Sequence, residues 1–200
     1  MNKKRFLIIA LMVGLLVYPA LAGNIVVNGD FETGPTFLAP WTTGQVGVGG
    51  GGDASIQTDN PHSPSHAFRF GAPTCCDTLA QTLTTTAGGS YNLSFWLQAD
   101  AEANSFSAEF LAYWDGKPTP ILDINSFPQG GFAYTQYSVL GLTATTTGTA
   151  LEFSAYDGGV LYLRLDDVSV TDAVPEASGW ILMSAGLLAL GGLRRLRKKL

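Results

Sequence analysis

The sequence predicts an all-β protein, a β-sandwich that lies between two short terminal segments of different character. From residue 23 to residue 173 no segment has a helical period, and Thr, Ser, Gly and aromatic residues are abundant. Turn signals recur about every ten residues, which is typical of all-β domains. With no helix to cover a sheet, about nine strands must bury their apolar faces on one another.

This pattern favours a jelly roll among the sandwich architectures. It does not separate a jelly roll from an immunoglobulin-like sandwich, although the Cys-Trp-Cys spacing of the latter is missing.

The N-terminal residues 1–22 have the three parts of a signal peptide. Residues 1–5 are basic, residues 6–17 are apolar, and Ala20-Leu21-Ala22 is a small-residue cleavage site. We therefore expect cleavage between Ala22 and Gly23, and export of the chain from Gly23 onward. The remaining residues 23–173 suit one domain with a sizeable core.

The predicted strands succeed one another through this domain. The glycine-dominated run 47–52 is a loop, because glycine loses much backbone entropy in a strand. One segment, 118–124, is an edge strand because it contains Pro118 and Pro120. The expected strands are 24–27, 66–70, 78–83, 90–98, 105–114, 118–124, 132–140, 150–156 and 160–170.

Strands 90–98 and 105–114 alternate most clearly between apolar and polar residues. Their outward positions include Trp96 with Gln98, and Tyr113 with Glu109. If the two strands are neighbours, these four residues form an amphipathic ligand face on which a sugar ring can stack. If the strands lie across the sandwich, or loops cover the rings as a minor core, that face does not form. The sequence leaves these alternatives open.

The charge of the exported part is strongly one-sided. Residues 23–178 contain only Arg69, Lys117 and Arg164 as basic residues, but all 16 acidic residues of the chain. Nucleic acid and anionic lipid are therefore excluded as partners, because both would be repelled. Divalent cations and neutral polymers remain as possible partners. The alternative is that the negative charge only keeps the domain soluble.

Cys75 and Cys76 are the only cysteines and are adjacent. Export favours their oxidation. We expect a vicinal disulfide in a surface loop, with free thiols or pairing between chains as the alternatives.

Signals for catalysis are weak. His62 and His66 lie in a Pro/Ser-rich loop, and the neighbouring Ser63 lacks a nucleophile elbow. The chain is therefore expected not to be an enzyme.

The last 27 residues, 174–200, form a tripartite segment. An apolar run, 179–193, comes after a short Pro-Glu motif, and a basic cluster, 194–200, comes after the run. The run is shorter than the roughly 20 residues that span a bilayer, so it predicts a weak or temporary transmembrane helix. The motif residues are Val174, Pro175, Glu176, Ala177 and Ser178.

This segment resembles the PEP-CTERM sorting signal of Gram-negative bacteria. Val174, Pro175, Glu176 and Ser178 match that signal, whereas Ala177 replaces its usual second proline. The resemblance implies transient anchoring in the inner membrane, with exosortase and the secretion machinery as partners. Processing would then move the protein towards the cell surface or extracellular matrix.

Four further segments resemble galactose-binding-like jelly rolls, a group that includes carbohydrate-binding modules. The resemblance implies a structural calcium ion where the first and last strands pair. It implies Glu32 and Asp167 as ligands and Asp30 as a third, and strand phase favours Asp167 over Asp166. The alternative is that Asp30 caps a turn and the Asp pair is solvated. The four segments are 28–34, 79–83, 89–96 and 165–170.

Together these observations predict a non-catalytic surface or matrix protein. Its domain would bind carbohydrate, or act as an adhesive module, in an exopolysaccharide or biofilm matrix. The alternatives are a secreted glycan-active enzyme and a structural surface protein without a ligand.

Overall fold

The computed structural model describes residues 23–45, 54–71, 76–100, 108–128, 130–156 and 162–173. Residues Gly23–Ala173 form one compact unit. The predicted signal peptide, the sorting segment and Cys75 lie outside the described residues. Within the described ranges there is no helix at all, and hence none able to cross a membrane.

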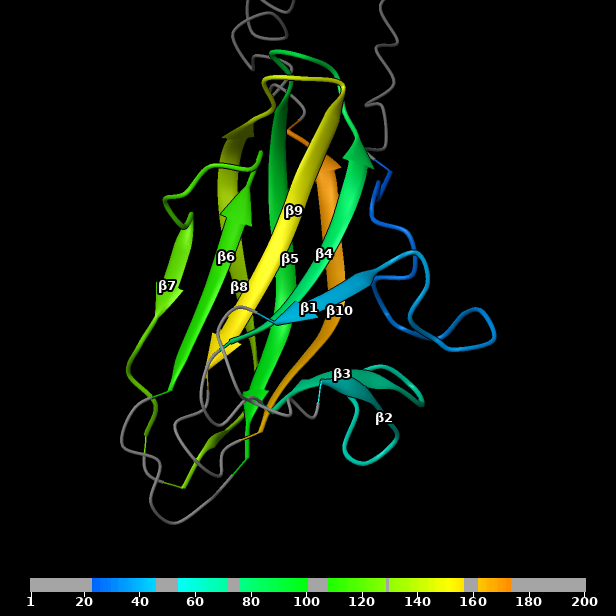
Figure 1. The fold of residues 1–200 in the computed structure, drawn as a ribbon, viewed down its shortest axis with the longest axis vertical. Helices are drawn as coiled ribbons and strands as arrows, with labels where there is room; N and C mark the ends of the chain where they lie inside the picture. The colour runs from blue at the N-terminus through cyan, green and yellow to red at the C-terminus, as the bar shows by residue number, and fades with distance from the viewer. Residues whose placement is uncertain are drawn as a thin grey trace, which may run out of the picture. The chain divides into compact units, whose positions relative to one another are not determined.

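Ten strands form two antiparallel five-stranded sheets that pack face to face (Figure 1). The front layer in Figure 1, called the β9 sheet, contains in order β1 (Thr42–Gln45), β4 (Asp77–Thr84), β9 (Gly148–Tyr156), β6 (Glu109–Trp114) and β7 (Leu122–Ile124). The second layer, called the β10 sheet, contains in order β2 (Ser55–Gln57), β3 (Ala67–Phe70), β10 (Leu163–Asp172), β5 (Ser90–Ala99) and β8 (Phe132–Thr143).

The core lies between the two inner faces. Phe95 of the β10 sheet contacts Phe110 and Phe153 of the β9 sheet, with ring centroids 5.5 and 5.2 Å away. All three rings are fully buried, as are the inward leucines of β4, β5, β9 and β10. The predicted all-β sandwich is confirmed, because residues at alternate positions are buried as the period of a strand requires.

Most predicted strands are present, with shifted ends. The segment 24–27 is not one: it forms a single bridge between Asn24 and Thr171, and the chain then turns through the left-handed residues Asn28 and Phe31. The sequence pattern missed β1, which is polar and exposed throughout, and β2, which has 3 residues.

A bulge in β10 corrects the strand-phase argument for Asp167. The pairing of β10 with β5 shifts register between Asp166 and Ser169, and Asp167 adopts a left-handed φ of 48°. The bulge inserts one residue, so the next core-facing residue of β10 after Leu165 is Val168 and not Asp167. Asp167 is half-exposed, and Asp166 is the fully buried carboxylate of the pair.

Candidate functional site

A shallow groove crosses the outer face of the β9 sheet. Two adjoining pockets, of about 310 and 200 Å³, share Ala150 of β9 in their lining. Ala80 and Thr82 of β4 lie beside Ala150, and these small side chains leave the middle of the sheet low. The pockets together extend over four strands, from Thr42 on β1 to Tyr113 on β6.

Tyr113 stands at one end of this groove. It is half-buried and lies directly across from Glu152 on β9. Burial raises the pKa of Tyr113, and the carboxylates of Glu109, Glu152 and Asp123 raise it further. The phenol therefore stays protonated at neutral pH, with an apolar ring and a hydroxyl donor beside carboxylate acceptors.

A second tyrosine, Tyr156, lies on the same face of the sheet. Tyr156, on β9, pairs with Glu109 of β6. Glu109 in turn lies four residues before Tyr113 on the same strand. At about 3.3 Å per residue the two tyrosines are separated by about 13 Å along the strand. The outer face of the β9 sheet thus carries two tyrosines, of which Tyr113 lines the groove and Tyr156 lies outside its lining.

The predicted ligand face of Trp96, Gln98, Glu109 and Tyr113 does not exist as one surface. Strand β5, with Trp96 and Gln98, pairs with β10 and β8, whereas β6, with Glu109 and Tyr113, pairs with β9 and β7. Alternation reports which face of a strand a residue occupies, but not which sheet the strand joins. The consecutive strands β5 and β6 therefore lie in different sheets, across the sandwich from each other.

Trp96 is covered by a neighbouring loop. The His62 ring stacks on it with centroids 4.1 Å apart and planes tilted by 19°, and Tyr134 meets His62 edge-on. Gln98 is 9% exposed, and its Oε1 atom is buried without a hydrogen bond. On this side the arrangement is that of the alternative, in which a loop lies over the rings.

Asp166 holds that loop against the β10 sheet. Its Oδ2 accepts hydrogen bonds from the amides of His62 (2.9 Å) and Ser63 (2.8 Å). Its Oδ1 accepts from Ser63 Oγ (2.9 Å) and from the Asp167 amide (2.7 Å). Burial raises the pKa of Asp166, although the hydrogen bonds from Ser63 oppose this.

Glu32 holds the far end of the same loop. Its Oε1 accepts from the amides of Ser65 (2.7 Å) and His66 (2.8 Å), and its Oε2 lies 2.8 Å from His66 Nδ1. Burial would raise the pKa of Glu32, but these hydrogen bonds prevail and leave it below its ordinary value.

Arg164 is a buried cation that sequence reasoning did not single out. It pairs with Asp59, with atoms 2.6 Å apart, and with Asp100. The available signal was its rarity, as one of three basic residues in an acidic domain. Burial would lower the pKa of Arg164, yet the bonds to Asp100 and Asp59 raise it. We assign this cluster a structural role.

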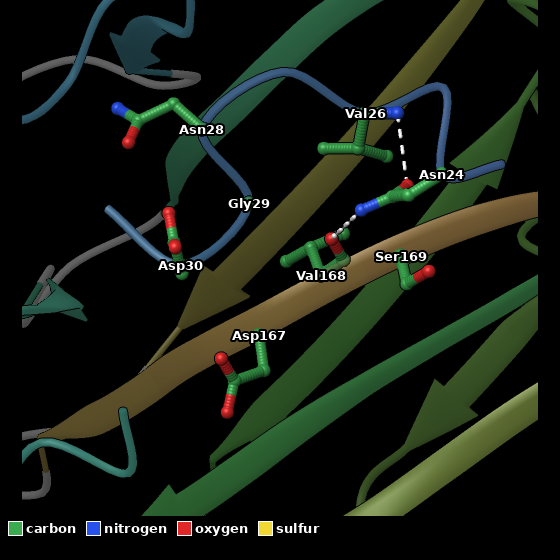
Figure 2. A pocket seen from close by; sticks show the side chains of 8 residues that line it. All are labelled: Asn24, Val26, Asn28, Gly29, Asp30, Asp167, Val168 and Ser169. Carbon is green, nitrogen blue, oxygen red and sulfur yellow. Dashed lines mark hydrogen bonds between the residues drawn. The ribbon is translucent and has the colours of Figure 1, made fainter. Parts of the chain in front are cut away.

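A third surface, a pocket of about 360 Å³, lies where the N-terminal segment meets β10 (Figure 2). Figure 2 shows Asp30 on the N-terminal segment and Asp167 on β10, both lining this pocket, and the Asn24 side chain bridging the Val26 amide and the Val168 carbonyl.

Two of the three predicted calcium ligands thus line one pocket, with oxygen-rich neighbours of the kind calcium takes. The third, Glu32, is bound to the loop instead. In addition, Asp167 Oδ2 lies 2.5 Å from His62 Nδ1. Within the described ranges no three acidic, His or Cys residues group closely enough to hold a metal. Calcium binding stays a prediction.

The other predicted features can be placed in part. Cys76 is disulfide-bonded, but Cys75 lies outside the described residues, so the vicinal pairing stays a prediction. Ser63 and His62 bond to different carboxylates, and the described contacts include no hydrogen bond between their side chains. A nucleophile and its base would share such a bond.

The fold is similar to several solved structures. One is TmCBM61 in complex with β-1,4-galactotriose, at 17% identity over 74% of this chain and 98% of that chain, with a TM-score of 0.55. Another is the K3 cleaved adhesin domain of Lys-gingipain from Porphyromonas gingivalis, at 18% identity over 75% and 98%, with a TM-score of 0.55.

A third is the enzymatically active domain of bacteriophage CBA120 tailspike protein 4, at 19% identity and a TM-score of 0.51. The match covers 74% of this chain but 21% of that one. No protein-family model and no curated protein matches this chain. At these identities the likeness shows a shared sandwich fold.

Proposed function

We propose that residues 23–173 form a non-catalytic carbohydrate-binding module that holds a glycan in the groove across the β9 sheet. The observation that carries this proposal is the groove itself, with a floor of small residues and Tyr113 at its end. An open depression of this kind accepts a polymer that continues beyond the protein at both ends. The galactotriose complex of the similar TmCBM61 domain supports the same ligand class.

Tyr113 is the expected anchor. Its ring can stack on the apolar face of a pyranose, while Glu152 and the Thr42 and Thr82 hydroxyls accept or donate to sugar hydroxyls. Trp96, the more obvious aromatic in the sequence, is not available in the same way because His62 covers its ring.

The test is retention on insoluble polysaccharides. Tyr113→Ala should weaken retention about tenfold, the value of one aromatic stacking contact, with little change in melting temperature. Tyr113→Phe keeps the ring and should retain most binding. Thr86→Ala, an exposed change in the loop after β4 and outside the groove lining, is the matched control. Equal retention of Tyr113→Ala and the parent would remove the groove as the glycan site.

The same incubation separates the function classes. Retention without new reducing ends is expected of a binding module. Release of reducing sugar would identify a glycan-active enzyme, and indifference to every polysaccharide would indicate a purely structural protein.

The itinerary of the protein is a second part of this proposal. It is exported, held in the inner membrane by the segment 179–193, and sorted by exosortase to the surface or extracellular matrix of a Gram-negative bacterium. The paired basic and apolar patterns at both ends support this. Intact mass of the surface form should show cuts after Ala22 and near Glu176; a species that retains 194–200 would contradict tail processing.

A further inference from the structure

Strand β8 ends the β10 sheet and leaves one long edge unpaired. It pairs with β5 on one side, and it runs for 12 residues. The other sheet edges in the described part are short: β1 has 4 residues, and β2 and β7 have 3 each. A long free edge presents a row of amide and carbonyl groups that can pair with another strand.

Two of the features that usually protect such an edge, charged side chains and proline, are missing from β8. No charged residue occurs between Asp123 and Glu152, and β8 contains no proline. In contrast, Pro118 and Pro120 precede β7, which carries Asp123. The Leu140 side chain is 74% exposed. In the described contacts, backbone groups from 134 to 140 have no partner on the side away from β5.

We infer that this edge docks a second copy of the same chain, with β8 antiparallel to β8 across a two-fold axis. Such a contact is isologous, and it joins the two β10 sheets into one. The charge of the domain favours this location. Two acidic copies repel over most of their surface, whereas β8 and the outward Asn92, Ser94 and Trp96 beside it on β5 carry no charge.

The register of β8 locates the axis. Its pairing with β5 is uninterrupted from Thr135 to Val139, and irregularities lie beyond both ends of this stretch. A two-fold axis at its centre, Tyr137, places Gln136 opposite Ser138 of the second copy. Both side chains are exposed on the outer face, so changes there leave the core intact.

The test uses the full chain in a non-ionic detergent, with mass measured by sedimentation over a concentration series. The parent should dimerise, and its dimer fraction should rise with salt, because salt screens the remaining repulsion. Gln136→Lys with Ser138→Lys sets lysine against lysine twice and should weaken dimerisation about tenfold or more. Gln136→Lys with Ser138→Glu sets lysine against glutamate twice and should restore it.

Thr84→Lys, at an exposed position of β4 outside the groove lining, is the matched control and should dimerise like the parent. Circular dichroism melting curves verify that every variant is folded. A monomeric parent, or a double-lysine variant that still dimerises, would overturn the proposal. So would a failure of the lysine–glutamate variant to recover, or a dimer fraction that falls with salt, as expected of an ionic contact. The glycan groove lies on the other sheet, so this outcome is independent of the proposed function.

Discussion

Asp166 is the residue on which the loop over the β10 sheet depends. It is fully buried, and both of its oxygens accept two hydrogen bonds each. A buried carboxylate is unfavourable by itself, because it loses its hydration. Here the loop amides and the Ser63 hydroxyl replace water around the carboxylate, which in turn accepts hydrogen bonds from these partly buried donors.

Asp166→Ala should therefore lower the free energy of unfolding by about 2–4 kcal/mol, since it leaves several partly buried donors unsatisfied. Asp167→Asn is the matched control, because asparagine tolerates the left-handed φ of this position. It weakens an ion pair in which the Asp167 and His62 side chains are each 31% exposed, and it should cost about 1 kcal/mol or less. Urea denaturation of both variants decides the matter. Equal losses would mean that Asp166 does not hold the loop.

At the scale of single elements, the N-terminal segment packs tightly on the last strand. Gly29 lies against β10, where its carbonyl accepts a hydrogen bond from the Val168 amide at 2.9 Å. A Cβ added at Gly29 would lie 2.0 Å from the Val168 carbonyl oxygen, closer than real Cβ contacts allow. Only glycine permits this approach of the two backbones.

Gly29→Ala should consequently destabilise the domain by about 2 kcal/mol or more, because either the turn or the bulged strand must move. Gly23→Ala, at a site where an added Cβ meets nothing, is the control and should change stability little. Thermal melting of the two variants would show the difference. If they melt alike, the contact between Gly29 and Val168 contributes nothing to stability.

The elements also show what sequence patterns can and cannot predict. The alternation in β5 correctly predicted that Leu93, Phe95 and Leu97 are buried, because burial follows from a period of two. The same pattern carries no information on strand neighbours, so it could not place Trp96 and Tyr113 on different sheets. Burial is a local property of a strand, whereas pairing depends on the topology of the whole chain.

Irregular positions were the other source of error. The bulge at Asp167 reverses the phase of β10 after Leu165, and the intact alternation of the preceding residues gives no warning of it. The hydrogen bonds of Glu32 and Asp166 to the loop likewise join segments far apart in the sequence. The floor of the groove could not be predicted for a related reason. Ala80 and Ala150 are far apart in the sequence and come together only because β4 pairs with β9.

At the scale of the whole molecule, the first and last segments of the domain close the sandwich together. Asn24 bridges to β10, and Asp30 and Asp167 line one pocket at this junction (Figure 2). The domain has a large excess of acidic residues, so carboxylates that come close together here repel one another unless a cation is shared or they are protonated. The junction is thus where a cation would add most to global stability.

Calcium should raise the melting temperature of the parent relative to chelator, because a cation that binds the folded state alone stabilises it. The gain is about 2.7 kcal/mol at a hundredfold excess over the dissociation constant. Asp167→Asn should remove this response, since Asp167 lines the pocket. Glu32→Gln is the informative partner variant: it should lower stability through the loop yet keep the calcium response, because Glu32 binds Ser65 and His66. Identical parent melting curves with calcium and with chelator would exclude the ion, and a calcium response lost in Glu32→Gln would make Glu32 a ligand.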